Sequence, residues 1–161
     1  LEARVQCSSR SVVVAAYVSS PVLGYGDKCT AVFYSPGGDA ADAAPQTGDR
    51  GGYQMDFRSG REALRERAAD EEECADILMV KPALAYLDVV HAARAQTNLP
   101  LAVYNVSGEY AMVKAAAQRG MLDERRVVPE LLTAIFRAGA DIVVTYHELD
   151  WTSWRREHSA R

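Results

Sequence analysis

Short apolar runs alternate with stretches of helical periodicity along the last two thirds of the chain. The run Ala75–Val80 is apolar with β-branched members, which is typical of a buried strand. After it, Leu84, Leu87, Val90 and Ala93 recur at helical spacing. The full pattern predicts strands over 77–80, 101–106 and 141–145, and helices following Ser59, over 84–96, over about 109–118, and from about 123 to 139.

This alternation of strands and helices predicts an α/β fold with a parallel sheet and crossover connections. Lys81, Ser107 and Tyr146 each fall at the C-terminal end of a different predicted strand. In a (β/α) barrel, that edge of the sheet carries the functional site. A complete barrel needs about 250 residues, and this sequence offers only four or five strands. The pattern therefore indicates part of a barrel.

The first third of the chain is less regular. Residues 12–17 and 22–25 are apolar enough for two further strands, the second leading toward Lys28. Residues 34–60 are rich in Gly, Asp and Pro and contain no periodic run. A loop of that length inside a compact domain is usually functional, so we expect a lid over the site across about 34–60.

Composition narrows the classes of function. With 161 residues, 48% of them hydrophobic and 25% charged, the chain can bury the core of one globular domain. A net charge of -4 leaves no basic surface for nucleic acid. The apolar run Val12–Val18 is too short to span a membrane. Cys7, Cys29 and Cys74 match no zinc or disulfide spacing, which suggests buried thiols in a reducing compartment.

Lys81 is the strongest candidate for chemistry. It ends an apolar strand and is followed by Pro82, which cannot continue the ladder and suits the first turn of the next helix. Partial burial would lower the pKa of the ammonium and leave a neutral amine able to attack a ketone. The alternative is a lysine whose charge snorkels to solvent from a strand end.

Several motifs in register closely resemble the porphobilinogen synthase family, also called delta-aminolevulinic acid dehydratase. They are Val80-Lys81-Pro82-Ala83-Leu84, Val106-Ser107-Gly108-Glu109-Tyr110-Ala111-Met112, Ala138-Gly139-Ala140-Asp141 with Thr145-Tyr146, and upstream Ala44-Pro45-Gln46, Gly48-Asp49-Arg50 and Tyr53-Gln54-Met55-Asp56. The resemblance covers 25–146 and implies the C-terminal half of a (β/α)8 TIM barrel. It divides the chain into a divergent segment 1–24, a partial catalytic domain 25–146 and a divergent tail 147–161.

The family joins two molecules of 5-aminolevulinate into porphobilinogen with loss of two waters, through lysine Schiff bases. By motif, Lys81 matches the main Schiff-base lysine. Lys28, in Tyr25-Gly26-Asp27-Lys28 followed by Phe33-Tyr34, matches the second. The resemblance also implies that Arg50 and Gln54 grip the carboxylate of one substrate, and that Ser107 and Tyr146 hold that of the other. Without it, Ser107 is a helix N-cap and Tyr146 a buried aromatic.

One departure from the family pattern bears on activity. Tyr34-Ser35-Pro36-Gly37-Gly38 places Gly38 where the family carries a substrate-binding arginine, and Gly51 stands where a basic or polar residue is usual. Losing one charge-assisted partner costs about 1.5–3 kcal/mol of binding. The sequence therefore leaves three explanations of these departures open, namely real divergence, an inactive paralogue and an error in gene assembly.

The resemblance also implies metals and partners. Relatives bind catalytic zinc through cysteines of the N-terminal half, so Zn2+ is not assignable to residues of this chain. Some bind allosteric Mg2+ through a helical glutamate, which Glu66 matches. The family forms homo-oligomers, usually octamers, and is cytoplasmic, or plastid-located in plants and algae.

Two other functions remain open from the sequence. One is another Schiff-base enzyme on the same barrel, such as an aldolase-type lyase, which would not need Lys28, Arg50 and Gln54 together. The other is a catalytically inactive half-barrel with a role in assembly, which Gly38 favours.

Overall fold

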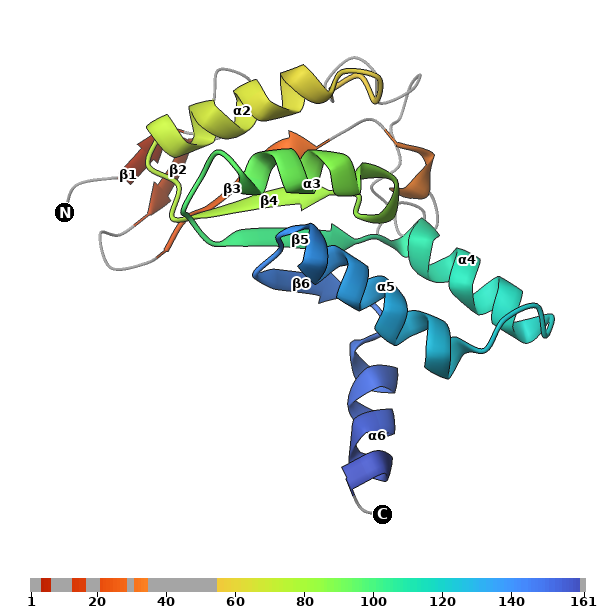
Figure 1. The fold of residues 1–161 in the computed structure, drawn as a ribbon. Coiled ribbons are helices and arrows are strands. Elements are labelled where there is room, and N and C mark those ends of the chain that lie inside the picture. Colours follow the sequence, from red (N-terminus) through yellow and green to blue (C-terminus); the bar gives the residue numbers. More distant parts are fainter. Residues whose placement is uncertain (1–3, 7–12, 17–20, 29–30, 35–54, 160–161) are drawn as a thin grey trace.

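A four-stranded parallel sheet with helices packed against one face forms the centre of the molecule (Figure 1). The computed structural model describes residues 4–6, 13–16, 21–28, 31–34 and 55–159. The strands are β1 (Arg4–Gln6), β2 (Val13–Ala16), β3 (Leu23–Lys28), β4 (Ile77–Lys81), β5 (Leu101–Asn105) and β6 (Ile142–Thr145). The helices are η1 (Val32–Tyr34), α2 (Gly60–Glu72), η3 (Leu84–Tyr86), α3 (Leu87–Arg94), α4 (Ser107–Gln118), α5 (Glu124–Ala138) and α6 (Glu148–Ser159).

The sheet order is β3-β4-β5-β6, and each neighbouring pair is parallel. Each strand lies beside its predecessor in the sheet, with helical segments between β4 and β5 and between β5 and β6, which is the repeating connection of a (β/α) barrel. Strands β1 and β2 form a separate antiparallel pair. The predicted parallel α/β architecture, with four of its strands, is confirmed.

The core lies between the sheet and helices α2, α3 and α5. Alternate residues of the central strands, Leu78 and Val80 on β4 and Leu101 and Val103 on β5, are buried in this cluster. Because side chains of a strand alternate between faces, the residues between them point to the other face. There the neighbours in register are Met79, Ala102 and Ile142 in one row and Tyr104 and Val144 in the next.

Aspartates connect the amino ends of neighbouring strands. The Asp76 carboxylate, just before β4, accepts the Val22 N–H, just before β3, at 2.9 Å. The Asp141 carboxylate, just before β6, accepts the Leu101 N–H at the start of β5, also at 2.9 Å. Both aspartates stand in an Ala-Asp-Ile sequence, so the same local sequence makes the same strand-to-strand connection twice.

Most predicted elements are confirmed, with differences at their ends. The helix predicted over 84–96 is a 3-10 turn, η3, followed by α3, and Pro82 precedes both rather than standing in a first helical turn. The sequence Ser59-Gly60-Arg61-Glu62 has the form of a capping box, and Ser59 does stand before α2, but its side chain makes no capping hydrogen bond. At the start of α5, the Asp123 carboxylate does cap the helix and accepts the Arg125 N–H at 3.0 Å.

One further expectation needs correction. Cys74 is exposed with a φ of 67°, not buried, because it stands in the tight turn between α2 and β4. The tail carries helix α6, which runs away from the sheet (Figure 1). None of the described helices combines the length and apolarity that are needed to cross a membrane.

Candidate active site at the carboxyl edge of the sheet

Lys28 and Lys81 end neighbouring parallel strands and are direct partners in the register of β3 and β4. The backbone thus brings the two predicted lysines together at the carboxyl edge of the sheet. Only the backbone of Lys28 is described. Lys81 is half-buried on the face opposite the helices, which in a closed barrel is the interior.

Tyr104 is the aromatic neighbour of Lys81. The Lys81 Nζ lies 6.0 Å from the centroid of the Tyr104 ring. On the backbone side, the Tyr34 hydroxyl donates to the Lys81 carbonyl at 3.0 Å, which docks η1 onto the end of β4. The predicted lowering of the Lys81 pKa stays a prediction.

Tyr146 lies just beyond β6, and its side chain reaches back toward Tyr104. Its hydroxyl lies 3.1 Å from that of Tyr104, and its ring is 6.2 Å from the Tyr104 ring. The residue is 48% exposed, so the expectation of a buried aromatic is wrong. Sequence reasoning missed Tyr104, although its place two residues before the end of strand 101–106 would have put it at this edge.

Ser107 is the first residue of α4, and Val106 takes the N-cap position instead. The predicted capping role is therefore one residue out of place. Ser107 is half-buried at the end of β5. The next residue, Gly108, is required by space, because a Cβ there would collide with the backbone of Phe33. The close approach of η1 to α4 thus depends on a glycine.

Glu109 joins the ends of β4 and β5 and was not predicted as a functional residue. It is 1% exposed. One carboxylate oxygen accepts the Leu84 N–H at 2.6 Å. The other accepts the Val106 N–H and the Asn105 amide, each at 2.9 Å, and the Ala83 N–H at 3.4 Å. The loop that follows Lys81 is therefore fixed to the loop that carries Ser107.

Burial raises the pKa of the Glu109 carboxyl above its ordinary value, and the four donated hydrogen bonds only partly offset that effect. A buried carboxyl that accepts from backbone donors on two loops is a positioning residue. It sets where the two strand ends lie with respect to one another.

Arg50 and Gln54, the predicted carboxylate-binding pair, lie outside the described residues, as do Gly38 and Gly51. Their roles stay predictions. The end of the predicted lid is described from Met55, which is buried in the core.

One group of three potential metal ligands exists among the described residues, so the described chain has residues able to hold a metal ion. It consists of Glu124, His147 and Asp150. Burial is the main cause that lowers the pKa of His147 below its ordinary value, which favours the neutral imidazole that a metal ion can bind. Glu66 lies half-buried on α2 and is not part of this group. Magnesium at Glu66 therefore stays a prediction.

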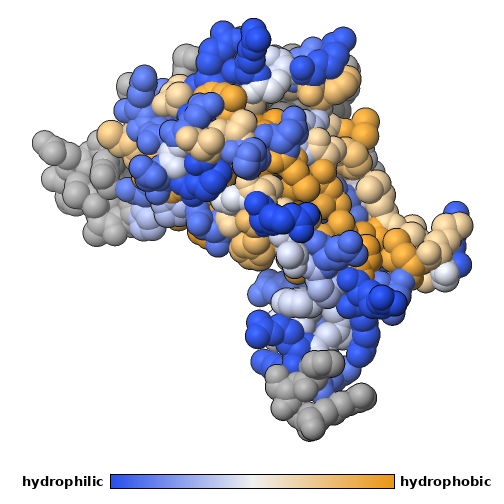
Figure 2. Space-filling model, in the orientation of Figure 1, coloured by the Kyte–Doolittle hydropathy of each residue, from blue (hydrophilic) through white to orange (hydrophobic). Residues whose placement is uncertain are grey.

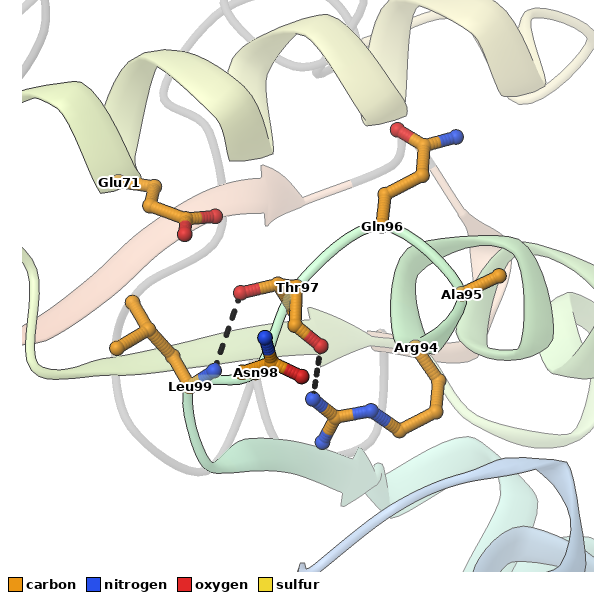
Figure 3. A pocket seen from close by; sticks show the side chains of 7 residues that line it. All are labelled: Glu71, Arg94, Ala95, Gln96, Thr97, Asn98 and Leu99. Carbon is orange, nitrogen blue, oxygen red and sulfur yellow. Dashed lines mark hydrogen bonds between the residues drawn. The ribbon is translucent and has the colours of Figure 1, made fainter.

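A pocket of about 300 Å³ lies at the other edge of the sheet, lined by Glu71 and residues 94–99 in the turn that leads to β5 (Figure 3). Within it the Arg94 guanidinium donates to the Thr97 carbonyl, and the Thr97 hydroxyl accepts the Leu99 N–H at 3.1 Å. In (β/α) barrels the amino edge serves stability rather than catalysis. We therefore place the candidate site at the carboxyl edge, with Lys81.

The parallel sheet, the helices on one face and the paired lysines at the carboxyl edge define a class, namely a partial (β/α) barrel with two lysines at the carboxyl ends of neighbouring strands. The family model for delta-aminolevulinic acid dehydratase matches residues 1–154 of the chain. The chain belongs to the delta-aminolevulinic acid dehydratase family.

Individual relatives agree with this assignment. The chain is 51% identical over 140 residues to the delta-aminolevulinic acid dehydratase of Synechococcus elongatus, covering 87% of this chain and 43% of the relative. It is 50% identical over 141 residues to that of Bacillus subtilis, covering 88% and 44%. The chain thus spans less than half the length of these relatives.

A solved structure shares the fold. It is the delta-aminolevulinic acid dehydratase (porphobilinogen synthase) of Toxoplasma gondii in complex with the reaction product porphobilinogen. The match has a TM-score of 0.81 at 47% identity and covers 83% of this chain and 38% of that chain. The family match also extends beyond residues 25–146, over which the motifs of the sequence were recognised.

Proposed function

We propose that this chain supplies the Schiff-base half of a porphobilinogen synthase active site. The reaction is the condensation of two 5-aminolevulinate molecules to porphobilinogen with loss of two waters. The observation that carries the proposal is the direct pairing of Lys28 with Lys81 at the carboxyl edge of the sheet. The relative from Toxoplasma gondii, which shares this fold, was solved with porphobilinogen.

Lys81 is the proposed nucleophile. Its neutral amine attacks the ketone carbon of 5-aminolevulinate, the carbonyl oxygen gains a proton, and loss of water leaves a protonated imine. Two lysines that share one site disfavour each other's protonation, which supports a neutral amine near pH 7. Lys28 is the second proposed Schiff-base lysine.

The substrate carboxylates need fixed donors. Tyr146 and Ser107 stand at the ends of β6 and β5, beside Tyr104 and Lys81, and their hydroxyls are proposed to hold the carboxylate of the first substrate. Arg50 and Gln54 are proposed to hold the carboxylate of the second. The guanidinium suits this role because its planar fork binds a carboxylate through two hydrogen bonds.

Borohydride trapping with 5-aminolevulinate, followed by peptide mass mapping, tests this proposal. We expect a reduced adduct on Lys81 and none there in Lys81→Arg, which keeps the charge but not the nucleophile. An adduct on Lys28 as well would place both lysines in one site. Folded protein with no adduct on either lysine would refute the proposal.

A second function, assembly without catalysis, is favoured by the apolar surface of the molecule. Ile142 and Val144 of the edge strand β6 are 41% and 39% exposed. Figure 2 shows further apolar surface toward α4 and α5, where Met112, Met121 and Phe136 are exposed. Association through these faces, as in a homo-oligomer, would persist in Lys81→Ala. Analytical ultracentrifugation of that variant separates assembly from chemistry.

A further inference from the structure

Three potential ligands, one from the start of α5 and two from the start of α6, meet where α4, α5 and α6 come together. Glu124 is the first residue of α5, His147 directly precedes α6, and Asp150 lies in the first turn of α6. One ligand atom from each lies within 4.8 Å of the others. This junction is at the foot of α6, beside Tyr146 but separate from the lysine pair.

His147 is the unusual member of the group. It is 2% exposed, and neither ring nitrogen has a hydrogen-bond partner among the residues that the structure describes. Its Nδ1 lies 3.8 Å from the Glu124 Oε1, so the ring points into the group. Buried polar atoms in folded proteins nearly always have a partner. An imidazole held in this way lacks the atom that its lone pair would bind.

Lys114 shows that the position between the carboxylates suits a cation. Its Nζ lies 2.6 Å from the Glu124 Oε1 and 2.6 Å from the Asp150 Oδ2. The side chain is 27% exposed, so it has a route to solvent along a flexible four-carbon stem. The ammonium neutralises one of the two negative charges and leaves both imidazole nitrogens unbonded.

We propose that Glu124, His147 and Asp150 form a zinc site in which the metal takes the place of the Lys114 ammonium. A divalent ion balances both carboxylates and also accepts the imidazole lone pair. Two carboxylates and one imidazole are a ligand set that zinc accepts, whereas magnesium and calcium take oxygen ligands. Zinc bonds of about 2.0–2.2 Å require the three ligand atoms to close around the ion from their present spacing.

A metal bound at this junction would hold the rings of Tyr110 and Tyr146 in place as well as α6. The Tyr110 ring lies 4.7 Å from the His147 ring and 5.7 Å from the Tyr146 ring, so the three rings pack in sequence. Holding the imidazole would therefore also hold the phenol that reaches toward Tyr104 and Lys81. The zinc site does not depend on the proposed Schiff-base chemistry and is tested without it.

Isothermal titration of the metal-free chain with Zn2+ tests the proposal. We expect one ion per chain, and binding weakened by roughly tenfold or more in Asp150→Asn and in His147→Leu. Lys114→Met should bind more tightly, because the competing ammonium is gone while the ligands remain. The matched control is His91→Gln, which removes an exposed histidine on α3 outside the group.

Cobalt substitution identifies the ligand atoms. Co2+ bound by imidazole and carboxylates shows d–d bands without the thiolate charge-transfer band that Cys74 or another cysteine would give. Circular dichroism checks folding, and Asp150→Asn serves if His147→Leu fails to fold. The proposal is overturned if neither the wild type nor Lys114→Met binds Zn2+, or if Asp150→Asn binds as tightly as the wild type.

Discussion

The two ends of the candidate site are held in different ways. At the first corner, where β4 and β5 end, the buried Glu109 accepts hydrogen bonds from two loops. At the second corner, where β6 leads into α6, Lys114 forms ion pairs with Glu124 and Asp150, whose side chains are 20% and 38% exposed. The first corner carries Lys81 and Ser107, and the second carries Tyr146.

The two corners differ in how much unfolding free energy is lost when the central residue, Glu109 or Lys114, is removed. Removing a buried acceptor leaves several donors unpaired away from water, whereas a partly exposed ion pair can be replaced by solvent. The two corners are also linked, because the Thr145 hydroxyl donates to the Asn105 amide oxygen at 3.0 Å and accepts the His147 N–H at 3.2 Å. Lys81, the proposed nucleophile, thus stands at the corner held by buried hydrogen bonds, and Tyr146 stands at the corner held by partly exposed ion pairs.

The substitution Glu109→Ala tests the first corner and should have the largest effect on stability. It leaves the Leu84 and Val106 N–H groups and the Asn105 amide without their acceptor in a buried site, so we expect a loss of about 3–5 kcal/mol of unfolding free energy. Urea denaturation measures it. A loss below about 1 kcal/mol would show that water replaces the carboxylate, and that this corner is no firmer than the other.

Lys114→Met tests the second corner and should cost less. The substitution leaves an unbranched side chain that is one atom shorter and removes both ion pairs, so we expect a loss of about 1 kcal/mol of unfolding free energy in low salt, which shrinks as salt is added. The same urea titration, repeated at two salt concentrations, provides the check. A salt-independent loss as large as that of Glu109→Ala would remove the distinction.

The pH dependence of stability sharpens the contrast further. Because burial raises the Glu109 pKa, the folded chain binds this proton more tightly than the unfolded chain does. Its contribution is full below the unfolded pKa and is lost as pH rises through the folded pKa. We therefore expect the wild type to gain stability relative to Glu109→Gln between pH 7 and pH 5.

That experiment compares unfolding free energies of the two proteins at both pH values. Burial lowers the pKa of His147, so its contribution to stability is present above the unfolded pKa and is lost as the pH falls from there through the folded pKa. This loss occurs in both proteins and cancels in the difference. A difference that stays constant with pH would mean that Glu109 titrates alike in the folded and unfolded chains.

Tyr146→Phe should have the smallest effect on folding. The hydroxyl is exposed and contacts only the Tyr104 hydroxyl among the hydrogen bonds described for it, so we expect a change within about 0.5 kcal/mol. Under the proposed function the same variant should need more 5-aminolevulinate for half-maximal trapping on Lys81. Unchanged trapping would show that Tyr146 does not bind the substrate, and it would not affect the predicted difference in stability between the two corners.

The sequence was sufficient to predict the arrangement of the sheet and the position of Lys81 at the end of a strand. Apolar runs that end in Lys81 and in Ser107 are local signals, and parallel pairing brings their carboxyl ends to one edge whatever the packing is. The pairing of Lys28 with Lys81 did not follow from the pattern, because the predicted strand 22–25 stopped short of Lys28, and only the family resemblance implied that the two lysines share a site.

The roles of Glu109 and His147 could not be obtained in the same way. Glu109 stands in a helical segment where a glutamate is ordinarily solvated, and its burial depends on the loop after Lys81 folding over it. His147 meets Glu124 across 23 positions of sequence, and only the packing of α5 against α6 reveals the contact. The 3-10 turn over 84–86 is likewise a tertiary effect, since Glu109 takes the N–H of Leu84 at its start.

The paired Ala-Asp-Ile connections have a consequence for the precision of the site. Asp76 and Asp141 fix where each strand begins relative to its neighbour, at the edge far from Lys81. Because the start of each strand is fixed, the number of residues in the strand determines where a side chain at its end, such as that of Lys81, lies. Inserting a single residue within β4 would leave both aspartate connections intact and yet turn the amine toward the helices. The positions of the side chains at the carboxyl edge thus depend on the strand starts that are fixed at the amino edge.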